Sequence, residues 1–363
     1  MSEPTTPATD ELADDIASRI RGLLDEAGIA ANRDQIAEIL ATGVRLGQDG
    51  TDRLDLKITS SALAEMRNAF KIFQPFHDVP KVTIFGSART RTDDPLYAQA
   101  HQAAKALADQ GWMVVTGAGP GIMQAAMEGA GVDRSIGVSI RLPFETRAND
   151  VIHDDPKHVS MKYFFTRKLM LVKESRGFLS VPGGFGTLDE TFELLTLQQT
   201  GKAEPTPIVL LDVPGGTFWQ GFQRFVDDQL VSIGVVSPDD LDRVLITDSV
   251  DAAVAEIVGF WRNYDSLRWV GKRLVLRLRA EPTDAEIDQL DDQFADLLLE
   301  GRIERSEPLG PERSGADRLS LPRLVLVMDQ HRIGSLHRLI RAINALGSAP
   351  EHLADPADVA PTD

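Results

Sequence analysis

Gly177-Phe-Leu-Ser-Val-Pro-Gly-Gly-Phe-Gly-Thr-Leu-Asp-Glu190 is the stretch that decides the fold of this chain. Its apolar start predicts a short buried strand over residues 177–181, and a helix is expected from about Thr187. Three glycines lie between the two, and glycine lets the backbone approach a ligand closely. The unpaired N–H groups at a helix start suit a phosphate, so the turn predicts a phosphate-binding cradle. The alternative is an ordinary strand-to-helix turn in which Thr187 and Glu190 form a capping box.

Strand and helix patterns alternate on both sides of this stretch, from about residue 80 to residue 262. Parallel strands joined by crossover helices produce such a pattern, so we predict an α/β domain with a doubly wound, Rossmann-like parallel sheet. In such sheets, ligands bind at the carboxyl ends of the strands, near the point where the strand order reverses. The expected strands cover 81–86, 112–117, 135–140, 177–181, 207–211 and 243–247, and the expected helices cover 96–109, 119–131, 161–175, 187–200, 218–232 and the residues after 249.

The segments that flank this domain have different patterns. Residues 1–10 and 348–363 are expected to be disordered tails, because they are polar and lack periodicity. Residues 11–79 show apolar residues at helical spacing and predict a helical extension. Residues 263–347 predict a small α+β appendage with strands at 273–278 and 323–328, an acidic helix at 283–299 opened by a Thr283–Glu286 capping box, a loop at 306–318 and a helix at 334–346.

Composition excludes several classes of function. The 363 residues include 38 Lys+Arg and 55 Asp+Glu, which gives a formal net charge of -17. Such a charge repels polyanions, so neither nucleic acid nor a phospholipid surface is expected as a partner. The absence of cysteine excludes disulfides, thiolate metal sites and cysteine nucleophiles. No apolar run suits a membrane span, and the acidic start does not resemble a signal peptide, so we expect a cytoplasmic protein.

A second glycine turn, Thr116-Gly-Ala-Gly-Pro-Gly121, also joins a strand to a helix. In a dinucleotide fingerprint the third glycine would stand at Ile122, and an acidic residue would follow the next strand, where this chain has Arg141. A nucleotide smaller than NAD is therefore favoured, with tight packing of helix on sheet as the alternative for each glycine. Gly86 and Ser87 follow the first strand, where Ser87 either donates to a ligand or caps the strand end.

The segment from residue 157 to residue 176 is locally basic in an acidic chain. A positive patch beside the glycine turn attracts a phosphorylated anion, whereas the alternative is a solvated helix face. Only one or two of its side chains need to face the site. The basic residues are Lys157, Lys162, Arg167, Lys168, Lys173 and Arg176, against the single acid Glu174.

With these motifs the chain resembles the LOG family, the cytokinin riboside 5'-monophosphate phosphoribohydrolases, which were long misannotated as lysine decarboxylases. The family signature P-G-G-x-G-T-x-x-E appears as Pro182 to Glu190, and its arginine–lysine pair appears as Arg167-Lys168. The resemblance covers residues 80–262. Gly86-Ser87 and the turn at 117–121 also match the family. The fit is closest to the longer bacterial branch, through Gly119-Pro-Gly-Ile-Met123 and Leu142-Pro-Phe-Glu145.

The resemblance implies hydrolysis of the N-glycosidic bond of a nucleoside 5'-monophosphate, with Arg167 and Glu190 as the catalytic pair. That chemistry needs no metal and no organic cofactor. The resemblance also implies a homodimer or a larger homo-oligomer. A non-catalytic nucleotide or cofactor carrier on the same fold is the alternative, and a carrier needs the cradle but not the acid. The substrate and its phosphate are expected to contact Gly86, Ser87, Gly117, Gly119, Gly121, Lys168, Gly183, Gly184, Gly186 and Thr187.

Overall fold

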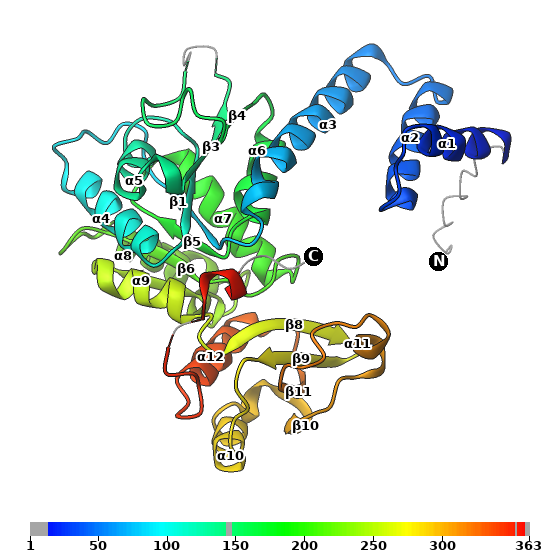
Figure 1. Ribbon diagram of the computed structural model, residues 1–363. Coiled ribbons are helices and arrows are strands. Elements are labelled where there is room, and N and C mark those ends of the chain that lie inside the picture. The colour runs from blue at the N-terminus through cyan, green and yellow to red at the C-terminus, as the bar shows by residue number, and fades with distance from the viewer. Residues whose placement is uncertain (1–13, 143–146, 353, 360–363) are drawn as a thin grey trace. The chain divides into compact units, whose positions relative to one another are not determined.

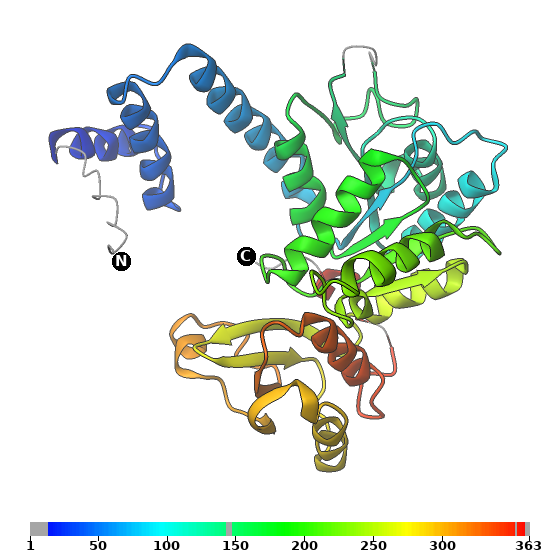
Figure 2. The ribbon, with the colours of Figure 1, turned by 180° about the vertical axis from the view of Figure 1, so that it is seen from behind.

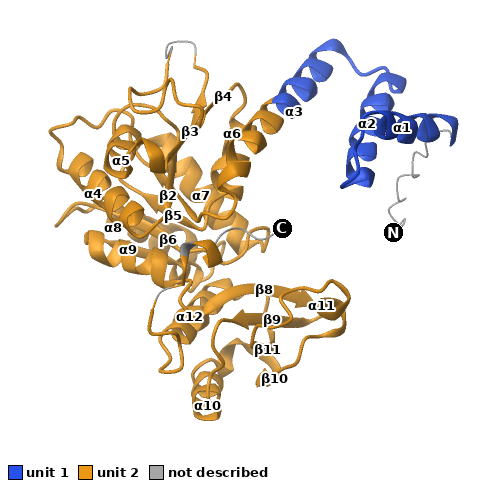
Figure 3. Cartoon of the chain, viewed as in Figure 1, with its two compact units in different colours: residues 1–64 blue, residues 65–363 orange. Residues whose placement is uncertain are grey.

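The computed structural model describes residues 14–142, 147–352 and 354–359 (Figure 1). The predicted tail at 1–10 and the motif residues 143–145 lie outside this range. The chain forms two compact units, residues 1–64 and residues 65–363, which are coloured separately in Figure 3. Within the described residues, no helix is both long enough and apolar enough to cross a membrane.

The helical extension consists of α1 (Asp14–Glu26), α2 (Arg33–Gln48) and α3 (Arg53–Phe73). α1 buries Ile20 and Leu24, which lie four residues apart and therefore share one face of the helix. The boundary between the two compact units falls within α3, after Ala64, rather than at residue 79.

A seven-stranded parallel sheet forms the centre of the second unit. Its strands lie in the order β4-β3-β2-β1-β5-β6-β7, and every pairing is parallel. The chain starts in the middle, builds outward to β4, then crosses back to the other side of β1, so the strand order reverses between β1 and β5. This confirms the predicted doubly wound α/β fold. The strands are β1 (Lys81–Phe85), β2 (Met113–Thr116), β3 (Ser135–Ile140), β4 (His158–Met161), β5 (Gly177–Ser180), β6 (Ile208–Leu211) and β7 (Val244–Thr247).

Helices cover both faces of this sheet (Figures 1 and 2). One face packs against α4 (Pro95–Asp109), α5 (Ile122–Ala130) and α9 (Val250–Gly259), which contribute small and aliphatic residues to one core. The other packs against the end of α3 together with α6 (Phe164–Lys173), α7 (Phe185–Gln199) and α8 (Phe218–Phe225). Because both faces are covered, the central strands β1, β2, β5 and β6 are buried along their whole length, as their mainly apolar sequences predict.

β4 was not predicted, and the helix expected over 161–175 begins only at Phe164. Met161 instead pairs with Ile140 of β3. β4 is an edge strand with Val159 and Met161 buried and Ser160 exposed, and four residues are too few to reveal that alternation in the sequence. The helix expected over 218–232 also changes form, because a π-helical segment, Val226–Val231, follows α8.

The appendage is a four-stranded antiparallel sheet in the order β10-β11-β9-β8, with three helices. The strands at 273–278 and 323–328 and the Thr283–Glu286 capping box are confirmed. The acidic helix is shorter than predicted, because the chain turns at Phe294 and enters an unpredicted strand. The elements are β8 (Tyr264–Val270), β9 (Arg273–Leu278), α10 (Asp284–Gln293), β10 (Leu298–Arg305), α11 (Gly310–Ser314), β11 (Arg323–Met328) and α12 (Ile333–Asn344).

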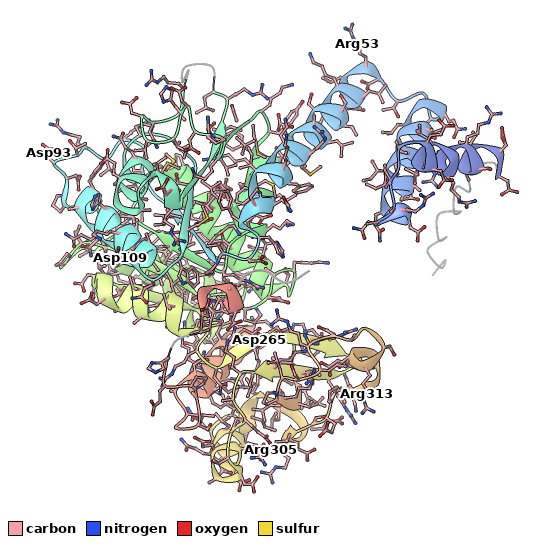
Figure 4. The ribbon with its side chains drawn as sticks, in the orientation of Figure 1. Arg53, Asp93, Asp109, Asp265, Arg305 and Arg313 are labelled. Atoms are coloured by element: carbon pink, nitrogen blue, oxygen red, sulfur yellow. The ribbon has the colours of Figure 1, made fainter. Side chains whose placement is uncertain are left out.

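The sequence did not predict β8 and β10, because they are edge strands with polar side chains. Figure 4 labels Asp265 on β8 and Arg305 at the end of β10. Asp265 is buried and pairs with Arg318, while Arg305 pairs with Asp284 of α10. Ion pairs of this kind conceal the alternation of apolar and polar residues that marks a strand.

The appendage shares a hydrophobic core with the parallel sheet. Trp261 and Tyr264 at the junction are buried in the same cluster as Leu336 and Ile340 of α12. The prediction of disorder from residue 348 is wrong for the described part of that segment. The Arg262 Nε donates to the Pro350 carbonyl at 2.6 Å, and Val359 of the 3-10 turn Pro356–Val359 is buried in the common core.

Candidate functional site

A cavity of about 1120 Å³ opens at the carboxyl ends of the central strands, where the strand order reverses. Its walls come from the loops after β1, β2, β3 and β5 and from α6 and α7, which is the place where doubly wound sheets bind ligands. Ten of the predicted site residues line it, whereas Gly121 and Lys168 do not. The ten are Gly86, Ser87, Gly117, Gly119, Arg167, Gly183, Gly184, Gly186, Thr187 and Glu190.

The β5–α7 turn places the start of a helix at this cavity. α7 begins at Phe185, two residues earlier than predicted, and Gly184 is its N-cap without a side-chain capping bond. Thr187 is therefore the third residue of the helix, and the capping box with Glu190 is not formed. The first N–H groups of α7 have no intrahelical acceptor, because no helical turn precedes them. A Cβ added at Gly184 or Gly186 would meet no atom within 4 Å, so both backbones are open to a ligand.

Glu190 lies on α7 about 9 Å beyond Gly184, at the helical rise of about 1.5 Å per residue. Its side chain is buried, and its Oε1 lies 3.9 Å from Nη1 of Arg167. Its Oε2 is buried and has no hydrogen-bond partner among the described residues. Burial raises the pKa of Glu190 to about 7, although Arg167 and Lys168 act in the opposite direction. A carboxyl with that pKa is divided between its acid and base forms at neutral pH.

Arg167 extends from α6 into the cavity and is hydrogen-bonded to the sheet. Its Nε donates to the Val138 carbonyl of β3 at 3.0 Å. The guanidinium passes directly over Gly117, where any Cβ would overlap it. This close approach is the physical requirement for glycine at position 117.

Lys168 turns away from the cavity. Its Nζ lies 2.9 Å from Asp189 Oδ2 and 2.8 Å from Glu193 Oε2, so it joins α6 to α7. Burial lowers the pKa of Lys168, but the two carboxylate hydrogen bonds outweigh burial and the net shift is upward. Among the six basic residues at 157–176, only Arg167 lines the cavity, which fits the expectation that one or two face the site.

The remaining glycines serve close packing between β1, β2 and α5. A Cβ added at Gly86 would overlap Ile122. Gly121 has a φ of +67°, and a Cβ added there would overlap the Ser87 carbonyl. That carbonyl accepts from the Ile122 N–H at 3.0 Å, which ties the two turns together. Both glycines therefore allow close packing in the structure, and Gly86 also lines the cavity.

Several cavity residues were not among the predicted site residues. Three arginines line it, Arg89, Arg141 and Arg147. Ser139 and His158 line it as well, and the Ser139 Oγ lies 2.8 Å from the His158 Nε2. Burial lowers the pKa of His158. Ser139 lies near the end of β3 and His158 starts β4, so recognising β4 was the signal needed to place the pair together.

Comparison with known proteins shows the family of this chain. A family model described as "Possible lysine decarboxylase" matches residues 121–257. The chain is 30% identical over 171 residues to the cytokinin riboside 5'-monophosphate phosphoribohydrolase of Mycobacterium tuberculosis, over 46% of this chain and 88% of the relative. The chain belongs to the LOG family. The Mycobacterium marinum member of the LOG family is 28% identical over 170 residues, again covering 46% of this chain and 88% of the relative.

Among solved structures, the molybdenum cofactor carrier protein from Chlamydomonas reinhardtii is 23% identical with a TM-score of 0.34, covering 49% of this chain and 94% of that chain. The match to the mycobacterial LOG proteins spans less than half of this chain. The family model leaves α3 and the appendage outside its matched residues 121–257.

Proposed function

We propose that this LOG-family protein hydrolyses the N-glycosidic bond of nucleoside 5'-monophosphates, releasing the free base and ribose 5-phosphate. The observation that carries the proposal is the buried Glu190 carboxyl on the helix whose start forms the glycine cradle, 3.9 Å from Arg167. A cradle for an anion and an acid of pKa about 7 thus lie on one rigid element. A nucleotide that spans them presents its sugar to the acid.

Each residue has a physical role in this proposal. The open N–H groups at Gly184, Phe185 and Gly186 and the positive end of the α7 dipole hold the phosphate. Arg167 donates to the phosphate or the ribose and fixes the sugar against Glu190, because charge-assisted hydrogen bonds are directional.

Glu190 stabilises the reaction at the anomeric carbon. As the C1'–N bond breaks, its electron pair leaves with the base and positive charge develops on the ribose, next to the carboxylate. Water then bonds to C1', and one of its protons passes to Glu190 while the other hydrogen stays on the new hydroxyl. Glu190 returns that proton to the departing base, so the atoms and charges balance.

The test is chromatographic separation of free base after incubation with a panel of nucleoside 5'-monophosphates. The wild-type chain should release base and an equal amount of ribose 5-phosphate. Glu190→Gln should lose release by a factor of about 100 or more while still binding the nucleotide. Glu128→Gln, an exposed glutamate on α5, is the matched control and should keep the wild-type rate. Release by Glu190→Gln at the wild-type rate would show that Glu190 is not the acid.

The same experiment separates the enzyme from a non-catalytic carrier. A carrier binds a nucleotide or cofactor through the cradle but releases no base from any member of the panel. A carrier does not use a carboxyl beside the sugar. Burying such a group without compensation destabilises the fold, so the buried Glu190 favours the enzyme. Binding without turnover by the wild-type chain would favour the carrier.

A further inference from the structure

Glu65 is a buried carboxylate on α3 that the proposed chemistry does not use. It is 6% exposed and lies on the same helix face as Ala69 and Phe73, which follow at four-residue intervals and pack in the core. A charged side chain in an apolar stripe is costly unless its oxygens are satisfied. Those of Glu65 are.

The partners of Glu65 form the entrance to α6. Its Oε1 accepts the backbone N–H of Lys162 at 2.8 Å, and its Oε2 accepts the Thr166 hydroxyl at 2.9 Å and the Tyr163 N–H at 3.4 Å. Tyr163, the N-cap of α6, provides no side-chain cap of its own. A carboxylate from another helix therefore supplies both the acceptor and the negative charge that this helix start favours.

Glu65 also holds a cavity arginine. Its Oε1 lies 3.1 Å from Nη2 of Arg141, which lines the cavity at the end of β3. Arg167 is the neighbour of Thr166 and donates its own N–H to the Tyr163 carbonyl at 3.2 Å. One carboxylate thus joins α3 to two arginine-bearing segments of the cavity wall, those of Arg141 and Arg167.

We propose that Glu65 is a positioning residue, which sets the places of Arg167 and Arg141 in the cavity by fixing the start of α6 and the end of β3. The inference rests on the proposed hydrolysis for its activity assay. It gives the α3 helix, which lies outside the residues 121–257 matched by the family model, a role in the site. Glu65 acts through the two arginines and does not itself contact the substrate.

The test compares Glu65→Ala and Glu65→Gln with Arg67→Gln, an exposed control on the next part of α3. Misplacing a reacting group by about 1 Å costs up to about 100-fold in rate, so we expect kcat/KM of Glu65→Ala to fall by about 10- to 100-fold. Glu65→Gln keeps one acceptor oxygen and should be partly rescued. Arg67→Gln should match the wild type. All variants are assayed below their unfolding temperatures, with folding verified by circular dichroism.

A pH profile separates positioning from simple loss of stability. Glu190 is faced by Arg167 and Lys168, which lower its pKa, and by Glu193 and Asp189, which raise it. Displacement of Arg167 in Glu65→Ala should therefore move the midpoint of the pH dependence of kcat/KM upward, and an unstable but correctly arranged site would not do so. A folded Glu65→Ala with an unchanged midpoint and kcat/KM within twofold of the wild type overturns the inference.

The failure of the proposed function gives a different result. If the wild-type chain releases no base, kinetics are replaced by calorimetric binding of AMP to the wild type, Glu65→Ala and Arg67→Gln. Weaker binding by Glu65→Ala alone, by about tenfold or more, then supports the positioning role without hydrolysis. Equal binding by all three chains overturns it.

Discussion

Ionisation of Glu190 should destabilise the fold, because the charged form of this carboxyl is buried. Its pKa is about 7 in the folded chain against an ordinary value of 4.5. Since the folded pKa is the higher one, the native state favours the protonated form. The stabilisation of that form is fully present below pH 4.5 and is lost as the pH rises through 7. From these two values, ionisation lowers the free energy of unfolding by about 1 kcal/mol at pH 5 and by about 3 kcal/mol at pH 8.

Glu190→Gln tests this reasoning, because glutamine has nearly the same shape and cannot ionise. Relative to the wild type, the variant should gain about 2 kcal/mol of unfolding free energy between pH 5 and pH 8. Urea denaturation followed by tryptophan fluorescence measures both proteins at the two pH values, and comparing the two values removes any constant effect of the amide. Glu128→Gln is the exposed control. A difference between variant and wild type that is equal at pH 5 and pH 8 would refute the desolvation of Glu190.

Three further outcomes are expected. Base release requires ionised Glu190, so kcat/KM should rise with pH about a midpoint near 7 and fall to about one tenth of its plateau at pH 6; a flat profile contradicts this. Gly117→Ala should lower kcat/KM by about 100-fold, because its Cβ overlaps the Arg167 guanidinium, whereas Gly22→Ala in open space on α1 should not change it. His337→Leu should stabilise the chain by about 1 to 2 kcal/mol in thermal unfolding, since both ring nitrogens are buried without a hydrogen-bond partner among the described residues.

The sequence predicted those parts of the fold whose burial pattern is uniform. The central strands are buried on both faces and appear in the sequence as short, mainly apolar runs, so β1, β2, β3, β5 and β6 were all placed correctly. The edge strands β4, β8 and β10 face solvent or ion pairs on one side, and their polar residues conceal them. Such strands are defined by the neighbour with which they pair, which local sequence does not specify.

The residues of the site were likewise predicted where the local sequence or the family motif marks them, and missed where it does not. Glu190 and the β5–α7 glycines lie within ten residues of one another, and Arg167 was found through the family motif, so the structure brings together residues that the sequence already indicated. Glu65 and His158 were missed for a common reason: each acts on a residue far along the chain, Thr166 or Ser139. A glutamate on a helix resembles a solvated side chain until its partners are known.

The glycines show how one motif serves two physical purposes. At Gly117 and Gly183 an added Cβ would overlap the Arg167 guanidinium and the Thr187 hydroxyl, so these positions are glycine because protein atoms already occupy the space. At Gly184 and Gly186 the space is open, and packing alone does not require glycine there. A backbone that stays bare in open space beside a helix start is suited to close approach of something from outside the chain. For this reason the two open glycines favour a bound anion, and the crowded ones fix the arginine and threonine that would contact it.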